Sequence, residues 1–193
     1  MDAKCLELRK IGGEESGKLV CNPELVRKNC LMISLGVNNQ INFEKHIQSL
    51  TNFKCQIIGV DSKLQDFTTS QEYAKIGGKL LFKKIAVNFP IVEIFSSKKN
   101  LIGRKMKIVE FLKIDIGGHE HFLLAPFLKQ FQVCQIFLQI HGKPLEHFEL
   151  IETIRKLGFK LFSFERSSKC VTCCDYSFVN EKCMFRYEVG NLE

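Results

Sequence analysis

The feature that most constrains the fold of this chain is a repeated alternation between short apolar runs and segments with helical spacing. Cys30–Leu35 is apolar almost throughout and predicts a buried strand, and Asn42–Leu50 follows with apolar residues at helical spacing. The same order recurs at Gln56–Val60, a second strand, which precedes a segment containing Phe67 and Tyr73 that reads as a helix. Such strand–helix steps predict an α/β fold with an open, mostly parallel sheet and helices on both faces.

The rest of the chain continues this order and ends in two short strands. Residues 91–107 fit a helix or an irregular excursion. Pro126 is expected to kink or break its helix, because proline lacks the N–H that an interior helical hydrogen bond needs. The last two strands are expected to pair as an antiparallel hairpin, since the link between them is too short for a crossover. In order, we predict a strand at Lys79–Val87, a strand at Glu110–Ile116, a helix carrying Phe122 to Leu128, a strand at Val133–Ile140, a helix at Glu146–Leu157, and strands at Phe159–Glu165, Tyr176–Asn180 and Met184–Val189.

Length and composition favour one globular domain. The chain has 193 residues, of which 45% are hydrophobic and 25% charged, as in ordinary globular proteins. A chain of this size can bury a stable core without a metal or a disulfide. We therefore predict a single domain over residues 1–193, in which residues 1–29 form an N-terminal segment before the first strand.

Membranes and nucleic acids are not expected partners. No apolar run approaches the roughly 18 residues that a membrane-spanning helix needs. The first ten residues lack the apolar stretch of a signal peptide, although the chain could be the remainder of a longer protein. The net charge of +7 favours approach to phosphates, but no aromatic residues interleave with the lysine and arginine clusters, as binding to single-stranded nucleic acid would favour.

Nine cysteines are many for a chain of this length. Cys55 and Cys134 lie inside apolar runs and are interpreted as small core residues. Three hypotheses stay open for the C-terminal cluster: free thiols, disulfides formed in an oxidising compartment, or a zinc site. A zinc ribbon needs two C-x-x-C knuckles and only one is present, so we assign no metal. The cluster consists of Cys170, Cys173, Cys174 and Cys183.

The ends of the predicted strands carry the candidate binding residues, because ligands of open α/β sheets lie at the carboxyl ends of strands. Gly36 would let backbone N–H groups approach a ligand, with Asn38 in the same loop; the alternative is a plain turn capped by an asparagine. Asp61 follows Gly36 by 25 residues, near the spacing of a carboxylate that binds ribose hydroxyls, although aspartate is also common in turns. Asp115 would be costly to bury unless paired or facing a ligand. His141 is a candidate general base, or a polar residue at the rim of the sheet.

Several segments, in the right order, resemble the FkbM-type methyltransferases. Residues 111–120 resemble the family's L-K-I-D-x-E-G-x-E segment, and residues 133–142 resemble the next strand, which usually ends E-I-H or E-V-H. Residues 158–165 and 173–178 resemble the closing segments G-F-x-x-F-x-x-E and C-x-E-Y-S-F. The closing motifs, together with residues 12–22 and 34–40, point to the animal methyltransferase-like branch common in nematodes.

This resemblance implies a class I, Rossmann-like methyltransferase fold with a seven-stranded sheet and S-adenosylmethionine as cofactor. It places Gly36 and Asn38 beneath the methionine and ribose and Asp61 on the ribose hydroxyls. Asp115 would lie in the wall of the pocket, as both a cofactor-binding and a catalytic residue. The expected activity is O-methylation of a small molecule or glycan, with His141 deprotonating the acceptor hydroxyl. Secretory or extracellular localisation is favoured by the resemblance and the cysteine content, with the cytoplasm as the alternative.

The chain departs from the family pattern at several positions. Gly117 stands where a second acidic residue is usual, and Gln139 stands where the strand usually carries glutamate before His141. Glu15–Lys18 replaces D-G-G-K, and Glu165–Ser167 replaces E-P-N. Because two pocket carboxylates are lost together, a catalytically inactive binding protein of the same fold is the alternative function.

A secretory protein of this branch is expected to contain disulfides. We predict at least one within the C-terminal cluster, from Cys170 or Cys173 to Cys183, because the predicted terminal hairpin would bring its ends close. Neighbouring Cys173 and Cys174 are not expected to bond to each other, since that ring is strained. Cys21 and Cys30 are a second predicted pair.

Overall fold

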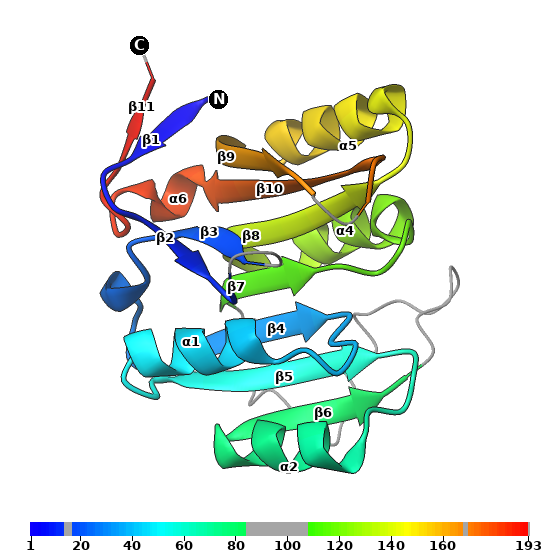
Figure 1. The fold of residues 1–193 in the computed structure, drawn as a ribbon. Coiled ribbons are helices and arrows are strands. Elements are labelled where there is room, and N and C mark those ends of the chain that lie inside the picture. The colour runs from blue at the N-terminus through cyan, green and yellow to red at the C-terminus, as the bar shows by residue number, and fades with distance from the viewer. Residues whose placement is uncertain (14–16, 84–107, 168–169, 193) are drawn as a thin grey trace.

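A seven-stranded sheet forms the centre of the molecule (Figure 1). The computed structural model describes residues 1–13, 17–83, 108–167 and 170–192. The strand order of the described sheet is β6-β5-β4-β7-β8-β10-β9, and β10 runs opposite to the other six strands. The strands are β4 (Cys30–Leu35), β5 (Cys55–Asp61), β6 (Gly78–Phe82), β7 (Ile108–Ile114), β8 (Gln132–His141), β9 (Phe159–Arg166) and β10 (Cys173–Asn180).

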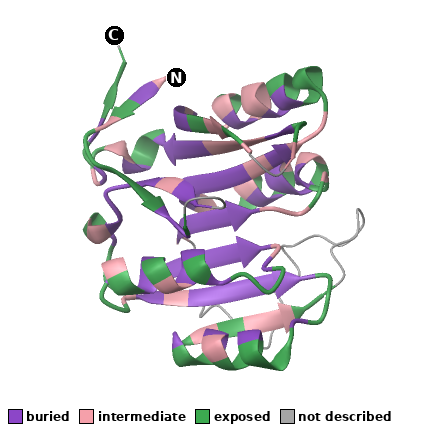
Figure 2. Ribbon diagram, in the orientation of Figure 1, coloured by how far each residue is buried: buried purple, intermediate pink, exposed green. Residues whose placement is uncertain are grey.

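Two hydrophobic clusters cover the two faces of this sheet, as the alternation along β4 requires. Leu31, Ile33 and Leu35 join one cluster with side chains of α4 and α5, and Cys30 and Met32 join the other with side chains of α1 and α2. The central strands β4, β5, β7 and β8 are buried along most of their length, whereas the edge strand β6 and the outer faces of the helices are more exposed (Figure 2). The helices are α1 (Asn42–Leu50), α2 (Phe67–Lys75), α4 (Glu120–Gln130), α5 (Pro144–Lys156) and α6 (Glu181–Met184), with a 3₁₀ turn η1 at Pro23–Leu25. The prediction of a mostly parallel sheet with helices on both faces is confirmed.

The N-terminal segment differs from the prediction, because three short strands precede β4. β2 (Leu8–Ile11) and β3 (Lys18–Cys21) form an antiparallel pair. β1 (Ala3–Cys5) pairs with the last strand, β11 (Val189–Asn191), so the two ends of the described chain lie together (Figure 1). These strands are only three or four residues long, too short to show a clear alternation in sequence.

The expected terminal hairpin is formed one step earlier in the chain, by β9 and β10. Of residues 184–189, predicted as a strand, residues 184–188 instead complete α6 and form a turn, and Val189 begins β11. Asn180 caps α6 by accepting a hydrogen bond from Lys182 N. Cys183 and Tyr187, four residues apart, are both fully buried, and Tyr187 N donates to Cys183 O at 3.2 Å, a helical contact that a strand could not make.

Pro126 lies inside α4, which continues to Gln130, so the expected break is wrong. Leu123, Leu124 and Phe127 are buried against the sheet, and their burial offsets the single backbone hydrogen bond that proline cannot make. The predicted strand at Lys79–Val87 corresponds to β6 up to Phe82; its residues 84–87 and the ambiguous segment 91–107 lie outside the described residues.

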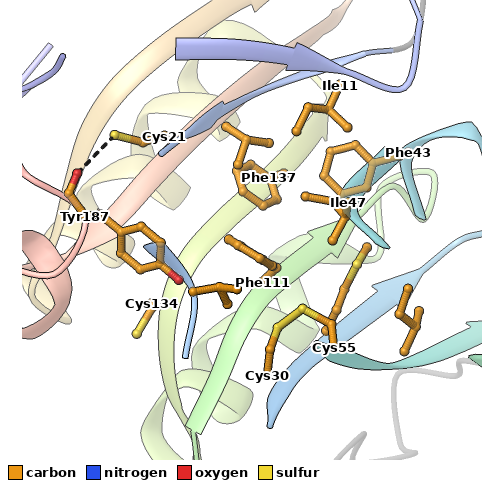
Figure 3. Packing of buried hydrophobic residues seen from close by; sticks show 14 of the residues in the cluster. Ile11, Cys21, Cys30, Phe43, Ile47, Cys55, Phe111, Cys134, Phe137 and Tyr187 are labelled. Atoms are coloured by element: carbon orange, nitrogen blue, oxygen red, sulfur yellow. Dashed lines mark hydrogen bonds between the residues drawn. A yellow bond between two sulfur atoms is a disulfide. The ribbon is translucent and has the colours of Figure 1, made fainter. Parts of the chain in front are cut away.

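Eight of the nine cysteines form disulfides. The prediction of at least one bond within the C-terminal cluster is confirmed by Cys170–Cys173, but the predicted partners of Cys183, Cys21 and Cys30 are wrong. Cys183 bonds to Cys134 of β8 rather than to the C-terminal cluster, because α6 carries it over the sheet. Cys21 bonds to Cys5, while Cys30 bonds to Cys55, its register partner in the parallel pair β4–β5 (Figure 3). Cys55 and Cys134 are therefore buried, as expected, but they are not free thiols. The fourth pair is Cys170–Cys173, and Cys174 is free.

Two features are absent from the described ranges. These ranges contain no cluster of three or more histidine, cysteine or acidic residues arranged to hold a metal ion. Their helices include none that is both long and apolar enough to cross a membrane.

Candidate functional site

A cavity of about 380 Å³ opens at the carboxyl ends of β4, β5, β7 and β8. It brings together all five residues selected from the sequence: Gly36, Asn38, Asp61, Asp115 and His141. They meet because β5, β4, β7 and β8 are consecutive neighbours in the sheet and run parallel. Sequence reasoning did not select the other lining residues, which are Ser62, Lys63, Ile116, Gly117 and His119.

Gly36 allows the loops after β4 and β7 to approach each other closely. Its φ is +80°, in the left-handed region, and a Cβ atom at this position would lie 1.8 Å from the backbone oxygen of Asp115. Its N–H donates to Val60 O at 2.9 Å, and Asp115 N donates to Leu35 O at 2.9 Å, which joins three strand ends. Any side chain here would push these loops apart.

Asp61 organises the loop that follows β4. The residue is 5% exposed, and its Oδ2 accepts hydrogen bonds from Val37 N and Asn38 N, both at 2.8 Å. Its Oδ1 accepts from Lys63 N at 2.8 Å. A carboxylate oxygen can accept two hydrogen bonds, so Oδ1 retains capacity for a ligand. Asp61 is thus more than a turn residue, since it positions backbone groups of the cavity wall.

The asparagines of this loop do not cap α1, which corrects the alternative drawn from the sequence. The N-cap of α1 is Ile41, and no side chain caps it. Asn38 and Asn39 instead adopt left-handed backbone, with φ of 47° and 55°. Asn39 Oδ1 accepts from Asp66 N at 2.9 Å and so holds the loop against the start of α2.

His141 is held by a buried carboxylate that sequence reasoning left without a role. Glu120 is fully buried, and its Oε1 accepts from His141 N at 2.7 Å and lies 3.0 Å from His141 Nδ1. Its Oε2 accepts from Gly118 N at 2.9 Å. Because Glu120 is an acceptor, Nδ1 carries the hydrogen, and Nε2 is left to face Asp115 Oδ1 at 3.9 Å. The sequence offered one indication of this pair: Glu120 lies in the segment 111–120 and His141 in the segment 133–142, and both segments resemble family motifs.

Two of the departures from the family pattern, Gly117 and Gln139, lie beside this arrangement. Gly117 lines the cavity without a side chain and has φ of 62°. Gln139 points away to β10, where its Nε2 donates to Asp175 Oδ1 at 3.1 Å. Asp175 also pairs with Lys18, which is nearly buried. The contact between Glu120 and His141 is therefore present even though Gly117 and Gln139 stand where the family usually has acidic residues.

A smaller recess of about 50 Å³ lies against the same loop and shares Gly36, Asn38 and Asp115 with the main cavity. Lys18 and Lys113 line it, and both side chains are less than a tenth exposed. Lys113 Nζ lies 3.2 Å from Glu44 Oε1. This side of the site therefore carries buried, paired cations.

Comparisons with known proteins agree on the fold. Solved structures with the same architecture include the fibrillarin pre-rRNA processing protein of Methanococcus jannaschii, at 12% identity and TM-score 0.53, covering 91% of this chain and 71% of that one. Aeropyrum pernix fibrillarin with bound S-adenosyl-L-methionine matches at 11% identity and TM-score 0.56, covering 80% and 68%. M. capricolum TrmK with S-adenosyl-homocysteine matches at 9% identity and TM-score 0.51, covering 82% and 66%. No curated protein sequence matches this chain.

These neighbours show that the fold is that of the class I S-adenosylmethionine-dependent methyltransferases. The family model described as "Methyltransferase FkbM domain" matches residues 4–161, most of the chain. This span includes every residue that lines the main cavity. The chain therefore belongs to the FkbM methyltransferase domain family.

Proposed function

We propose that this protein binds S-adenosylmethionine in the main cavity and methylates a hydroxyl group of a small molecule or glycan. The main support for the proposal is that the five residues predicted from the sequence, at the ends of four different strands, line one cavity. Its volume lies at the lower end of the range of about 300–1,000 Å³ typical of ligand sites.

The residues of the cavity fit the cofactor. S-adenosylmethionine carries a sulfonium and an ammonium group, and the cavity offers two carboxylates, Asp61 and Asp115. The Asp115 side chain is 40% exposed and can receive a cation, while Asp61 Oδ1 can accept from a hydroxyl. Gly36 leaves backbone accessible where a Cβ would intrude. When bound, the cofactor supplies an electrophilic methyl group.

His141 is placed to take the proton of the acceptor hydroxyl. Glu120 holds Nδ1 and thereby directs the unprotonated Nε2 toward the cavity. After proton transfer the imidazolium lies between two carboxylates, Glu120 at 3.0 Å and Asp115 at 3.9 Å, which stabilises its charge. Glu120 is thus a positioning residue for His141.

The experiment is calorimetry with S-adenosylmethionine and S-adenosylhomocysteine, followed by a methyl-transfer screen over hydroxyl-bearing acceptors. We expect His141→Ala to keep cofactor affinity and to reduce kcat by about 10²–10⁴-fold, the usual contribution of general base catalysis. Glu120→Gln should lower kcat and change its pH profile, because the tautomer of His141 is no longer fixed. The matched control is His46→Ala, since His46 is exposed and does not line the main cavity.

An inactive binding protein is the alternative, and the losses at Gly117 and Gln139 favour it. It predicts no methyl transfer to any acceptor, whether or not the cofactor binds. Absence of cofactor binding would contradict the methyltransferase function and leave the binding protein as the function.

We also propose that the protein matures in the secretory pathway. Four disulfides support this, because such bonds persist in oxidising compartments. Mapping of disulfides in protein taken from its native compartment tests it: recovery of all nine cysteines as free thiols would favour the cytoplasm.

A further inference from the structure

A second cavity, of about 410 Å³, lies between the first half of α5 and the start of β10. No residue lines both this cavity and the candidate methyltransferase site. Its α5 wall is formed by Pro144, His147, Phe148 and Ile151, which share one helical face. The opposite wall includes Tyr176 of β10, so aromatic rings and an aliphatic side chain surround the space.

Large apolar side chains are left in water at this cavity. Phe148 is 59% exposed and Val171 is fully exposed, although both line the space. Grouped exposure of this kind marks binding sites, because a filled cavity would remove these side chains from water. Ile151 extends the apolar wall toward the interior, where it packs against the core cluster.

The ring nitrogens of His147, in the floor of the cavity, are already hydrogen-bonded to protein groups. His147 is 7% exposed, its Nε2 lies 3.1 Å from Thr172 O, and its Nδ1 lies 3.1 Å from the Tyr176 hydroxyl. Because a carbonyl only accepts, Nε2 donates to Thr172 O, and Nδ1 shares the other hydrogen bond with the Tyr176 hydroxyl. Burial, reinforced by the neighbouring Cys174, raises the pKa of Tyr176 to about 12, so its hydroxyl stays protonated. Tyr176 therefore adds no formal charge at neutral pH.

Arg166 supplies the permanent charge at this site. It lies at the exposed end of β9, and no carboxylate is among the described residues that line the cavity. The preceding Glu165 does not line the cavity; it pairs with Lys10 at 3.1 Å. A guanidinium above an apolar cavity favours a ligand that combines an anionic group with an apolar body.

We propose that this cavity binds a small amphiphilic anion, whose apolar body packs on Phe148, Ile151 and Tyr176 and whose acidic group pairs with Arg166. Binding at this site does not depend on the methyltransferase activity, so the two proposals can fail separately.

The test uses two fluorescent probes of nearly equal shape, the anionic anilinonaphthalene sulfonate and its uncharged parent phenylnaphthylamine. We expect one molecule of the sulfonate to bind the folded protein with a dissociation constant on the order of 10 μM. Arg166→Glu should raise the dissociation constant of the sulfonate by about tenfold or more and leave that of the uncharged probe unchanged. The matched control Lys156→Glu makes the same charge change on α5 outside the cavity and should affect neither probe.

Phe148→Ala should weaken the binding of both probes, because it removes part of the apolar wall that both would contact. Leu145→Ala is its control, since Leu145 is an exposed residue of the same helix that does not line the cavity. Circular dichroism should show native folding of each variant. The proposal is overturned if the folded protein binds neither probe, if Phe148→Ala and Leu145→Ala bind both probes alike, or if Arg166→Glu leaves the sulfonate affinity unchanged.

Discussion

Replacement of Asp61 by alanine tests how far one carboxylate holds the candidate site together. The change removes three hydrogen bonds from backbone N–H groups, those of Val37, Asn38 and Lys63. Val37 is 1% exposed, so its N–H would be left unpaired at a cost of about 1–3 kcal/mol. The other two donors can be rehydrated, and each bond contributes about 0.5–1.5 kcal/mol. The expected loss in free energy of unfolding is about 2–6 kcal/mol, a large share of domain stability.

Urea unfolding followed by circular dichroism measures this loss. Asp61→Asn should cost less, because the amide oxygen can still accept from Val37 and Asn38 while the amide nitrogen faces the Lys63 donor. The matched control is Asp66→Ala, which removes the cap of α2, where the exposed Asp66 side chain accepts from Thr69 N, and should cost about 1 kcal/mol.

The same variants test the cofactor site. In calorimetry below the unfolding transition, Asp61→Ala should weaken S-adenosylmethionine binding by about 1.5–3 kcal/mol. The reasoning is refuted if Asp61→Ala is no less stable than Asp66→Ala, and the cofactor role is refuted if wild type and Asp61→Ala bind equally.

Three further predictions concern the backbone, the disulfides and pH. Gly36→Ala should lower the free energy of unfolding by more than about 2 kcal/mol and abolish cofactor binding, because the new Cβ would meet the Asp115 backbone. Gly117→Ala should cost only about 1–2 kcal/mol, because its backbone is also left-handed but the space around the new Cβ is open. Equal losses for the two variants in urea unfolding would contradict this prediction. Replacing both Cys134 and Cys183 by serine should cost about 4 kcal/mol for a loop of 49 residues, and mapping of non-reduced peptides should recover that pair rather than a bond from Cys183 to the cluster. Burial opposes ionisation of Asp2, but hydrogen bonds from the α5 guanidinium and the β9 backbone outweigh it and hold the Asp2 pKa below its ordinary value of 3.8. Asp2 therefore contributes stability above about pH 4 that is lost as the pH falls through the lowered pKa, and the unfolding free energy of Asp2→Asn should vary less with pH in acid than that of wild type.

The sheet and its site were predictable from sequence because they depend on local patterns. β4 agrees with the predicted strand residue by residue, since continuous apolar runs mark strands covered on both faces. Once the strands are parallel neighbours, their carboxyl ends meet at one edge, so Gly36, Asp61 and Asp115 had to come together. His141 was found in the same way.

Partners across long sequence distances were not predictable. The prediction paired Cys183 with its neighbours in the chain, because the sequence shows only proximity along the chain. In the structure, α6 places Cys183 beside Cys134, with a Cα–Cα distance of 5.4 Å. β1 and β11 are too short to recognise singly and are defined by their pairing with each other.

The sequence by itself determined the α/β architecture, the family and the position of the site, because apolar periodicity and strand-end residues are local properties of the chain. Only the tertiary structure decided what each site residue contacts. Asp61 turned out to bind three backbone amides, and Glu120, buried at the start of α4, to hold His141. The reason is physical: a buried carboxylate must find hydrogen-bond donors, and which donors lie within reach is fixed by the packing of elements distant in sequence.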